Sequence, residues 1–399
     1  MTTRRRLAAL GCAASVLLAP LTVMGLAEAK TPPGKPVTVM TRNIYLGVDI
    51  NRPVEAAMEA AAQPGASLIT VLTALAHATD ESRRIVDRTD FHVRAELLAD
   101  EIGDARPDLV GLQEVALWRH GPMEIGQVGV PNAEVVDYDF LQILLDELAE
   151  RGTPYVAASI ADRADVEAPS FSGSVAAPVN PRDIRLTMRD VVLMRQSSSL
   201  TEIDEGQAVY DVNLSLGVAG VTFDFDRGYQ WIDVRAGSER FRFVNTHLEA
   251  FSSDIALAQA QQLVSEATSP DRSTIFVCDC NSDPVNSKVK EIDTVPHKAP
   301  YELITGPGGY TDLWKASGRP ADLPGFDAGD TSGLNETVDE PLPGSWTHRI
   351  DMVFGRTASG EPLTTDRGRV TGRDGDPRDP ATGLWPSDHA GVVMRVRGL

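Results

Sequence analysis

The pattern of apolar and polar positions predicts strands and helices in mixed order along the chain. Short β-prone runs bounded by turn residues occur at 37–40, 109–112, 190–194, 231–234, 241–245, 274–278, 350–354 and 392–396. Helical spacing occurs at 51–80, where Pro64-Gly65 divides two short helices, and at 91–102, 139–151 and 255–266. Residues 318–345 have little periodicity and predict a long loop. This order indicates an α/β sandwich of two mixed sheets with helices outside, although periodicity alone does not exclude other α/β architectures.

The first 29 residues have the features of an export signal. Three arginines at 4–6 precede an apolar run at 7–26, and the small-residue sequence Ala27-Glu28-Ala29 follows it. Two glycines and a proline interrupt the run, and no charged stop-transfer cluster comes after it. We therefore predict a cleaved signal peptide at 1–29, a single domain at 30–399 and a secreted protein, with the export route left open.

Cysteine content predicts a fold without cross-links. Cleavage of the leader removes Cys12 and leaves Cys278 and Cys280. Only one residue separates the two cysteines, and we expect a strand through this segment to direct their side chains to opposite faces. The sequence thus predicts that the core, rather than a disulfide, holds the fold.

The chain is acidic, with 57 Asp and Glu against 37 Lys and Arg and a formal net charge of −20. A field of this sign repels polyanions unless a basic strip or a bound cation offsets it. The charge therefore argues against tight nucleic-acid binding but does not exclude a nuclease.

Polar clusters directly follow several of the predicted strands, where a rigid scaffold can hold functional loops. These clusters are Asn43, Gln113-Glu114, Asn245-Thr246-His247, Asp279-Cys280-Asn281, Arg349-Ile350-Asp351 and Ser387-Asp388-His389. Each one alone is also compatible with an ordinary turn or cap. Their common position at strand ends suggests one shared site.

In order, the segments TRN, PDLVGLQEV, FVNTHLE, FVCDCNSDP, HRIDMVF and WPSDHAGV resemble the endonuclease/exonuclease/phosphatase superfamily. That superfamily includes deoxyribonuclease I, apurinic-site endonucleases, inositol-polyphosphate 5-phosphatases and bacterial sphingomyelinases. The resemblance covers about residues 37–399 and points to a secreted bacterial-type member. It implies a deoxyribonuclease I-like four-layer sandwich and a metal-dependent phosphoric ester hydrolase, most simply a phosphodiesterase.

The resemblance also implies a metal site. Glu114 is the first expected ligand, with Asn43 beside it and Asp388 completing the shell. Mg²⁺ prefers oxygen ligands and retains several waters, so one or two carboxylates suffice. The implied cofactor is therefore Mg²⁺ or Mn²⁺.

The remaining motif residues are expected to carry the chemistry. Asp279 would orient or deprotonate the attacking water, and Asn281 would hold that water or a phosphate oxygen. His389 would contact the phosphate while Asp351 accepts its ring proton, and His247 would stabilise the phosphoryl oxygens or assist the leaving group. These roles follow from the resemblance.

Three further residues are weaker candidates for substrate binding. Arg227 precedes a strand and resembles a loop found in some phosphodiesterases of the superfamily, where a basic side chain holds phosphate. Asp190 lies at the start of another strand, where capping is an alternative explanation. His348 adjoins Arg349 at the expected active edge.

Two departures from the superfamily pattern stand out. The family usually has Gly-Asp-Phe-Asn where this chain has Cys278-Asp279-Cys280-Asn281. A buried free thiol behaves as a small hydrophobe, and a redox or metal role is the alternative for the cysteine pair. The interval before Glu114 is also long, and we hypothesise that residues 45–90 form a helical insertion that caps the cleft and helps to select the substrate.

The sequence does not choose among the substrates of the superfamily. Nucleases, sphingomyelinase-like or phospholipase C-like lipid-headgroup phosphodiesterases, and phosphomonoesterases share this catalytic set. The expected partner is thus a phosphate ester, either nucleic acid or a phospholipid headgroup, and the chain is expected to be a monomer without a stable protein partner. A catalytically silent binding protein on this fold is the remaining alternative, but it would be expected to lose Glu114, Asp279 or His389.

Overall fold

A computed structural model describes residues 35–218, 220–319 and 328–399 of the chain, which belong to one compact unit. The predicted signal peptide at 1–29 lies outside the described residues. Within the described ranges, no helix combines the length and the apolar character that crossing a membrane requires.

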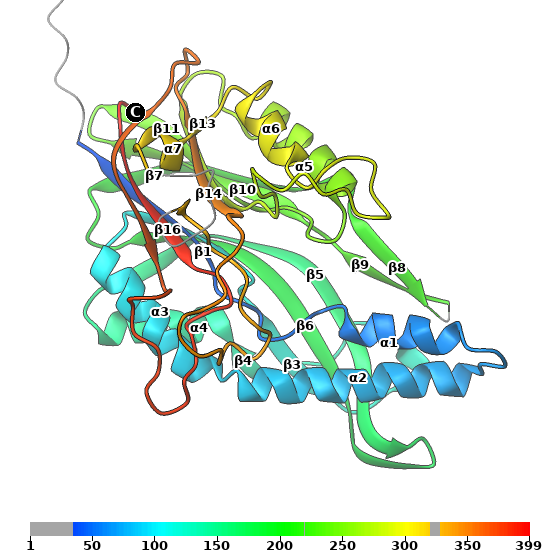
Figure 1. Ribbon diagram of the computed structural model, residues 1–399. Coiled ribbons are helices and arrows are strands. Elements are labelled where there is room, and N and C mark those ends of the chain that lie inside the picture. Colours follow the sequence, from blue (N-terminus) through cyan, green and yellow to red (C-terminus); the bar gives the residue numbers. More distant parts are fainter. Residues whose placement is uncertain (1–34, 219, 320–327) are drawn as a thin grey trace, which may run out of the picture. The chain divides into compact units, whose positions relative to one another are not determined.

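Two mixed β-sheets face each other (Figure 1). The first has the strand order β15-β16-β1-β2-β6-β3-β4, with β5 pairing along β6. Its strands are β1 Val37–Asn43, β2 Leu109–Gln113, β3 Leu117–Gly121, β4 Val135–Asp139, β5 Tyr155–Ser174, β6 Ala177–Arg195, β15 Thr364–Thr371 and β16 Gly391–Arg397.

The second sheet has the order β13-β14-β12-β11-β10-β7. Its strands are β7 Leu200–Val209, β10 Gly228–Ala236, β11 Glu239–His247, β12 Ser273–Asp279, β13 Thr311–Asp312 and β14 Asp351–Arg356. A separate hairpin consists of β8 Leu214–Val218 and β9 Val221–Phe225.

The alternating strands direct one apolar face of each sheet into a common core. Val39 and Leu109 from the first sheet lie in one buried cluster with Phe243 and Ile275 from the second. Strand β2 comes so close to the second sheet that a Cβ at Gly111 would lie 2.3 Å from Val277 and 2.6 Å from the side chain of Asn245. A residue without a side chain is therefore required at position 111.

Helices cover the outer faces, which gives four layers (Figure 1). The helices are α1 Arg52–Ala61, α2 Leu68–Arg88, α3 Phe91–Ala105, α4 Phe140–Glu150, α5 Ser253–Glu266, α6 Ala299–Thr305 and α7 Leu313–Ala316, with a 3₁₀ turn at Ile125–Gln127. Apolar residues of α2, α3 and α4 form a buried cluster with the first sheet, and those of α5 and α6 form one with the second. Side-chain caps begin α4 and α5, where Asp139 accepts from the amides of Leu141 and Gln142 and Ser252 accepts from that of Ile255.

The predicted α/β sandwich is confirmed, and each predicted strand and helix has a counterpart. Helix α2 extends to Arg88, however, and is not short. The sequence pattern missed several elements, namely β3, β4, β5, the first half of β6, β7, the β8–β9 hairpin, β13, β15 and the short helices α6 and α7. Of these, β5 and β6 carry charged residues that pair across strands, such as Asp165 with Arg185 at 2.6 Å, so their apolar alternation is weak.

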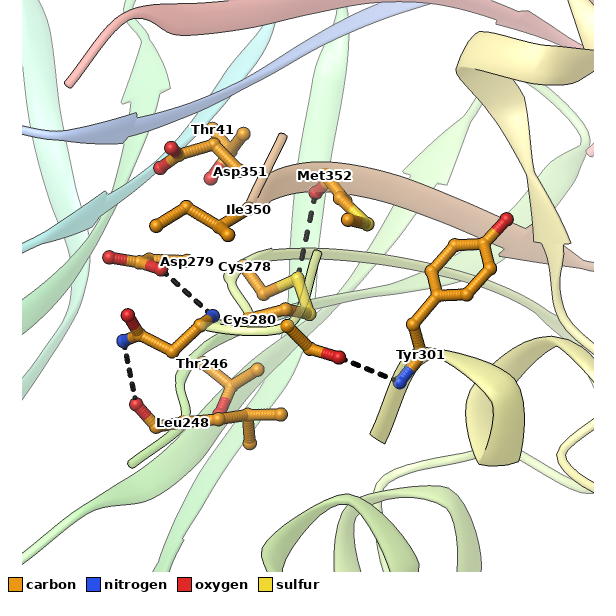
Figure 2. Close-up of a disulfide and its surroundings, with 12 residues drawn as sticks. Thr41, Thr246, Leu248, Cys278, Asp279, Cys280, Tyr301, Ile350, Asp351 and Met352 are labelled. Carbon is orange, nitrogen blue, oxygen red and sulfur yellow. Dashed lines mark hydrogen bonds between the residues drawn. A yellow bond between two sulfur atoms is a disulfide. The ribbon is translucent and has the colours of Figure 1, made fainter. Parts of the chain in front are cut away.

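The prediction that Cys278 and Cys280 stay unbridged is wrong, because the two form a disulfide (Figure 2). Strand β12 ends at Asp279, so Cys280 is the first residue beyond the regular strand. Side chains two positions apart lie on the same face of a strand, so alternation does not separate the two cysteines as we expected. Because the regular strand ends between them, their Cα atoms lie 5.0 Å apart, closer than the roughly 6.6 Å of an extended strand and within the range for a disulfide.

Candidate active site

A cleft of about 320 Å³ opens where the central strands of both sheets end. Most of the polar residues singled out in the sequence line it. They are Glu114, Arg227, His247, Asp279, Asn281, Asp388 and His389. Residues of the segment 45–50 and of the 334–336 loop form another part of its wall.

The strand register explains why His247, Asp279 and Asp351 lie side by side. Strands β11 and β12 run parallel with His247 opposite Asp279, while β12 and β14 run antiparallel with Asp279 opposite Asp351. In the other sheet, β1 and β2 run parallel and end together at Asn43 and Gln113. The polar groups therefore come from the same end of both sheets.

A hydrogen bond joins the two sheets at the base of the site. The amide of Asn43 donates to Oδ2 of Asp279 at 3.0 Å, and the Oδ1 atom of Asn43 accepts from the backbone of Tyr45 at 2.9 Å. Both Asn43 and Asp279 are almost completely buried. This contact orients the carboxylate of Asp279 relative to the loop that follows β1.

His389 and Asp351 form a buried pair, with Nδ1 of the ring 2.8 Å from Oδ2 of the carboxylate. Burial disfavours a charged ring, but the carboxylates of Asp351, Asp279 and Asp388 outweigh it and raise the pKa of His389 well above its usual value. These surroundings favour the charged form of His389, with Asp351 accepting the proton of Nδ1.

The surroundings of His247 favour its neutral form, in contrast to His389. Its Nδ1 atom lies 2.6 Å from Nη1 of Arg227, and both residues are buried. Burial, the charge of Arg227 and that of His389 lower the pKa of His247 well below its usual value. Because arginine can only donate, Nδ1 must accept, and a neutral ring then carries its proton on Nε2. Nε2 lies 3.4 Å from Oδ2 of Asp279 and 3.1 Å from the side-chain nitrogen of Asn281.

Three non-glycine residues around the cleft have left-handed backbone conformations. Their φ values are 59° for Tyr45, 60° for Glu114 and 44° for Asn281. Side chains other than glycine and asparagine rarely adopt this region, and such residues concentrate at functional sites. The turn that carries Glu114 is thus held by its surroundings and not by local preference, whereas the asparagine at 281 suits its conformation.

Carboxylates crowd this cleft. Burial raises the pKa of Asp279 to about 7. The positive charge of His389 lowers this pKa, while the negative charges of Asp351 and Glu114 raise it. Burial also raises the pKa of Asp388 to about 6. The positive charges of His389 and Arg94 lower this pKa, while the negative charges of Glu114 and Asp351 raise it. A divalent cation bound among these groups would relieve both their desolvation and their mutual repulsion.

The donors present suit a hard divalent cation. Glu114 and Asp388 both line the cleft, and Oε2 of Glu114 is oriented by the backbone amide of Leu46 at 2.9 Å. A second group that could hold a metal brings oxygens of Asp279 and Asp351 and a nitrogen of His389 within 4.8 Å of one another. In that group Oδ1 of Asp351 is buried and has no hydrogen-bond partner among the described residues.

We favour the oxygen set of Glu114 and Asp388, with Asn43 nearby, over the group that contains His389. The Nδ1 atom of His389 is already engaged by Asp351, and a protonated ring cannot ligate a metal through that atom. Oxygen donors are also those that Mg²⁺ and Mn²⁺ prefer.

Two of the weaker sequence candidates are not brought to the cleft. Asp190 is buried in an ion pair with Arg163, at 3.3 Å from its Nε atom, and burial raises the pKa of its carboxyl. His348 is exposed, and its Nδ1 atom lies 2.8 Å from Oγ1 of Thr347. Arg227, in contrast, lines the cleft beside His247.

Sequence reasoning missed a buried arginine that holds the site together. Arg94 of α3 donates to the carbonyl of Ile44 at 2.7 Å, to that of Tyr45 at 3.1 Å and to that of Pro386 at 3.2 Å. It thereby joins the loop after Asn43 to the loop before Asp388. Its position on an otherwise ordinary helix carries no sequence signal for this role.

Solved structures with the same fold support the architecture. An endonuclease/exonuclease/phosphatase family protein from Leptotrichia buccalis superimposes with a TM-score of 0.50 at 14% identity, over 90% of this chain and 99% of that one. A protein of the same family from Bacteroides thetaiotaomicron also gives a TM-score of 0.50 at 14% identity, over 92% of this chain and 99% of the other. No family model and no curated protein matches the chain. The likeness establishes the endonuclease/exonuclease/phosphatase fold that the sequence resemblance implied.

Proposed function

We propose that this protein is a secreted phosphodiester hydrolase that depends on Mg²⁺ or Mn²⁺. The observation that carries the proposal is the pair of buried histidines on either side of Asp279, with Nε2 of His247 at 3.4 Å and Nδ1 of His389 at 3.7 Å from its Oδ2 atom. His247 is paired with Arg227, which favours its neutral form, and His389 is paired with Asp351, which favours its charged form. Phosphoryl transfer needs both a base for the attacking water and fixed positive charge for the phosphoryl oxygens.

In this proposal Asp279 accepts the proton of the attacking water. A carboxylate with a pKa near the working pH is suited to this task, and its position is set by Asn43 and by the backbone amide of Asn281, which donates to Oδ1 at 3.0 Å. The side chain of Asn281 donates to the carbonyl of Leu248 at 3.0 Å, which orients the amide beside the water position. Asp279 and Asn281 would thus position the attacking water, and Asn43 would orient Asp279.

Positive charge for the phosphoryl group would come from His389 and Arg227. His389 would donate from its free ring nitrogen, because Asp351 holds the other nitrogen. Arg227 has a buried Nε atom without a hydrogen-bond partner among the described residues, in addition to the Nη1 atom near His247. A divalent cation bound by Glu114 and Asp388, with Asn43 nearby, would neutralise charge on the phosphoryl oxygens.

Hydrolysis of bis-p-nitrophenyl phosphate by the purified mature protein tests this proposal. Turnover should appear with Mg²⁺ or Mn²⁺ and disappear with EDTA. It should also be lost in His389→Ala, while the matched variant His92→Ala, an exposed histidine on α3, keeps wild-type rates. Metal binding without turnover of this diester, plasmid DNA or sphingomyelin would support a silent binding protein instead.

Secretion is the part of the proposal that rests on the leader alone. The three arginines, the apolar run and the small-residue sequence before residue 30 favour cleavage there. Expression of the full-length chain with N-terminal sequencing of protein in the medium tests it. Retention of residues 1–29 in a cell-associated product would contradict export by cleavage.

An apolar groove next to the cleft favours a lipid-headgroup phosphodiesterase over a nuclease as the specific activity. The groove shares Val48, Asp49 and Ile50 with the cleft. Its other walls come mainly from apolar side chains of α1, the first sheet and the β8–β9 hairpin, among them Pro53, Val54, Trp118, Val166, Ala168, Ile184, Leu186, Phe223 and Phe225. An apolar substituent of a phosphodiester would gain from burial in this groove, whereas a net charge of −20 disfavours a polyanion.

Comparison of substrates separates these activities. We expect sphingomyelin or phosphatidylcholine to be cleaved faster than plasmid DNA at equal phosphodiester concentration. Ala168→Leu, which would fill the groove of about 50 Å³, should slow the lipid reaction without slowing bis-p-nitrophenyl phosphate. Faster cleavage of DNA, unaffected by this variant, would favour the nuclease.

A further inference from the structure

The disulfide between Cys278 and Cys280 lies directly behind the candidate active site. The two cysteines flank Asp279 in the chain, and Asn281 follows the second of them. Figure 2 shows Asp279 and Asp351 on one side of the disulfide and Tyr301 on the other. The sulfur-bearing residues belong to the buried cluster between the second sheet and helices α5 and α6.

Asp279 is the last residue of β12, and Asn281 lies just beyond the end of the strand. The carbonyl of Asp279 accepts from the amide of Leu248 at 3.0 Å, and the amide of Cys280 donates to the carbonyl of Ile350 at 2.8 Å. Beyond these bonds the chain leaves the sheet, and Asn281 adopts a φ of 44°. The last ladder bond thus falls between the two residues proposed to hold the water.

Local preferences account for only part of this turn. The amide of Asn281 donates to Oδ1 of Asp279 at 3.0 Å, and asparagine tolerates the left-handed region better than most residues. Backbone freedom nevertheless normally increases where a strand ends. A covalent bond between the residues on either side of Asp279 closes a small ring, which restricts the backbone torsions of Asp279 and Cys280. The ring lies on the core side, so it leaves the carboxylate free to face the cleft.

We propose that Cys278 and Cys280 are positioning residues, and that their disulfide holds Asp279 and Asn281 in the geometry that hydrolysis requires. The inference rests on the proposed function. It adds a condition to that function, because the enzyme reaches full activity only where the disulfide can form. Oxidising compartments outside the cytosol meet this condition, which agrees with the predicted export.

Formation of the bond is a two-electron oxidation. The two thiols lose two electrons and two protons, and the disulfide of a thiol–disulfide oxidoreductase accepts them and becomes a dithiol. Both cysteines are fully buried in the folded chain, so this exchange must precede closure of the core. Once folded, the bond is shielded from reductants and acts as a permanent clamp.

The double variant Cys278→Ala/Cys280→Ala tests the positioning role. We expect kcat for bis-p-nitrophenyl phosphate to fall at least tenfold with KM changed less than threefold, because the groups that act on the water are displaced while the cleft remains. A purely structural role would lower the melting temperature but leave kcat unchanged below the transition, and this result would overturn the inference.

A mutant cycle shows whether the effect acts through Asp279. In an Asp279→Asn background, removal of the two cysteines should lower the residual rate by less than twofold. A loss as large as that in the wild-type background would overturn the inference, because it would place the effect elsewhere. Mature protein refolded with dithiothreitol should match the double variant, and protein refolded with oxidised glutathione should match the wild type.

Failure of the proposed function is separate from failure of this inference. If the wild type hydrolyses no ester, the proposed function fails. Amide hydrogen exchange then tests whether the disulfide restricts the backbone of the turn after β12. The amides of Cys280 and Asn281 should exchange at least tenfold faster in the double variant, while those of β1 stay unchanged. Equal exchange in both proteins would overturn the inference.

Discussion

The guanidinium of Arg227 donates from Nη1 to Nδ1 of His247 over 2.6 Å, and this contact fixes the neutral tautomer of the ring. Arg227 directly precedes β10 and His247 ends β11, and these two strands are antiparallel neighbours. An arginine in this position both keeps the proton on Nε2 and adds positive charge to the cleft. The protonation state of His247 therefore depends on the presence of Arg227.

Replacement of Arg227 by alanine should lower kcat/KM by roughly 10²-fold, the scale for removal of one buried donor at a developing oxyanion. The ring of His247 would also lose its fixed tautomer. Arg227→Lys keeps the charge but not the planar donor group, so we expect it to recover only part of the rate. Steady-state kinetics on bis-p-nitrophenyl phosphate measure both, and full activity in Arg227→Ala would contradict the role.

Asp351→Asn should reduce kcat by roughly 10³–10⁴-fold, because the amide no longer holds the proton on Nδ1 of His389 and no longer stabilises the charged ring. The carboxylate raises the pKa of His389, so its loss lowers that pKa and leaves less imidazolium near neutral pH. Rate measurements from pH 5 to 9 check this. An unchanged rate across that range would place Asp351 outside the mechanism.

Glu114→Gln should weaken binding of Mg²⁺ or Mn²⁺ by at least tenfold, because the substitution removes a negative charge but keeps the shape of the side chain. Titration calorimetry with Mn²⁺ measures the change directly, without turnover. Glu101→Gln is not a suitable control, since Glu101 pairs with Arg42 at 3.0 Å behind the site. Glu59→Gln on the exposed side of α1 is suitable, and equal affinities in Glu114→Gln and Glu59→Gln would contradict the ligand assignment.

Stability should decrease between about pH 6.5 and 4 because of His297. Burial, with the charge of Lys290, lowers the pKa of His297 to about 4, and its Nδ1 atom accepts from the amide of Asp283 at 3.0 Å. The native state thus disfavours the proton that the unfolded chain binds below pH 6.5, so stability is complete above this pH and is lost as the pH falls through 4. Urea unfolding at pH 7.5 and 5 should show a smaller difference in His297→Gln than in the wild type.

Arg52 connects the segment 45–90 to the opposite wall of the cleft through an ion pair with Glu336 at 2.5 Å. Both side chains are about one-third exposed, so Arg52→Ala should change the free energy of unfolding by less than about 1 kcal/mol. If this segment selects the substrate, the variant should alter KM for sphingomyelin but leave bis-p-nitrophenyl phosphate within twofold. Arg84→Ala, which removes a surface ion pair on α2, is the matched control, and equal kinetics in both variants would contradict the hypothesis.

Deletion of residues 50–80 is a less suitable test of the same hypothesis. Helix α2 places Val71, Leu75 and Ala76 in the buried cluster over the first sheet. Loss of these contacts would destabilise the domain whatever the segment does at the cleft. Point variants at its edge avoid this difficulty.

The sequence by itself determined the strand ends and the polar residues that follow them. Asn43, Glu114, Asp279 and Asp388 come after or before short apolar runs, and that local order is readable without knowledge of how strands pair. The two-sheet class followed from the mixture of periods together with the family resemblance. These features depend on neighbours in the chain, which the sequence states directly.

Only the tertiary structure decided which partner each polar group has. It paired Asp190 with Arg163 inside the protein, placed Arg227 against His247, and brought Arg94 to three carbonyls on two separate loops. It also joined Cys278 to Cys280, because strand β12 ends between them and the chain bends there, which brings their Cα atoms to 5.0 Å. Pairing of this kind depends on strand register and on where a ladder stops, and both are set by contacts between segments far apart in the chain.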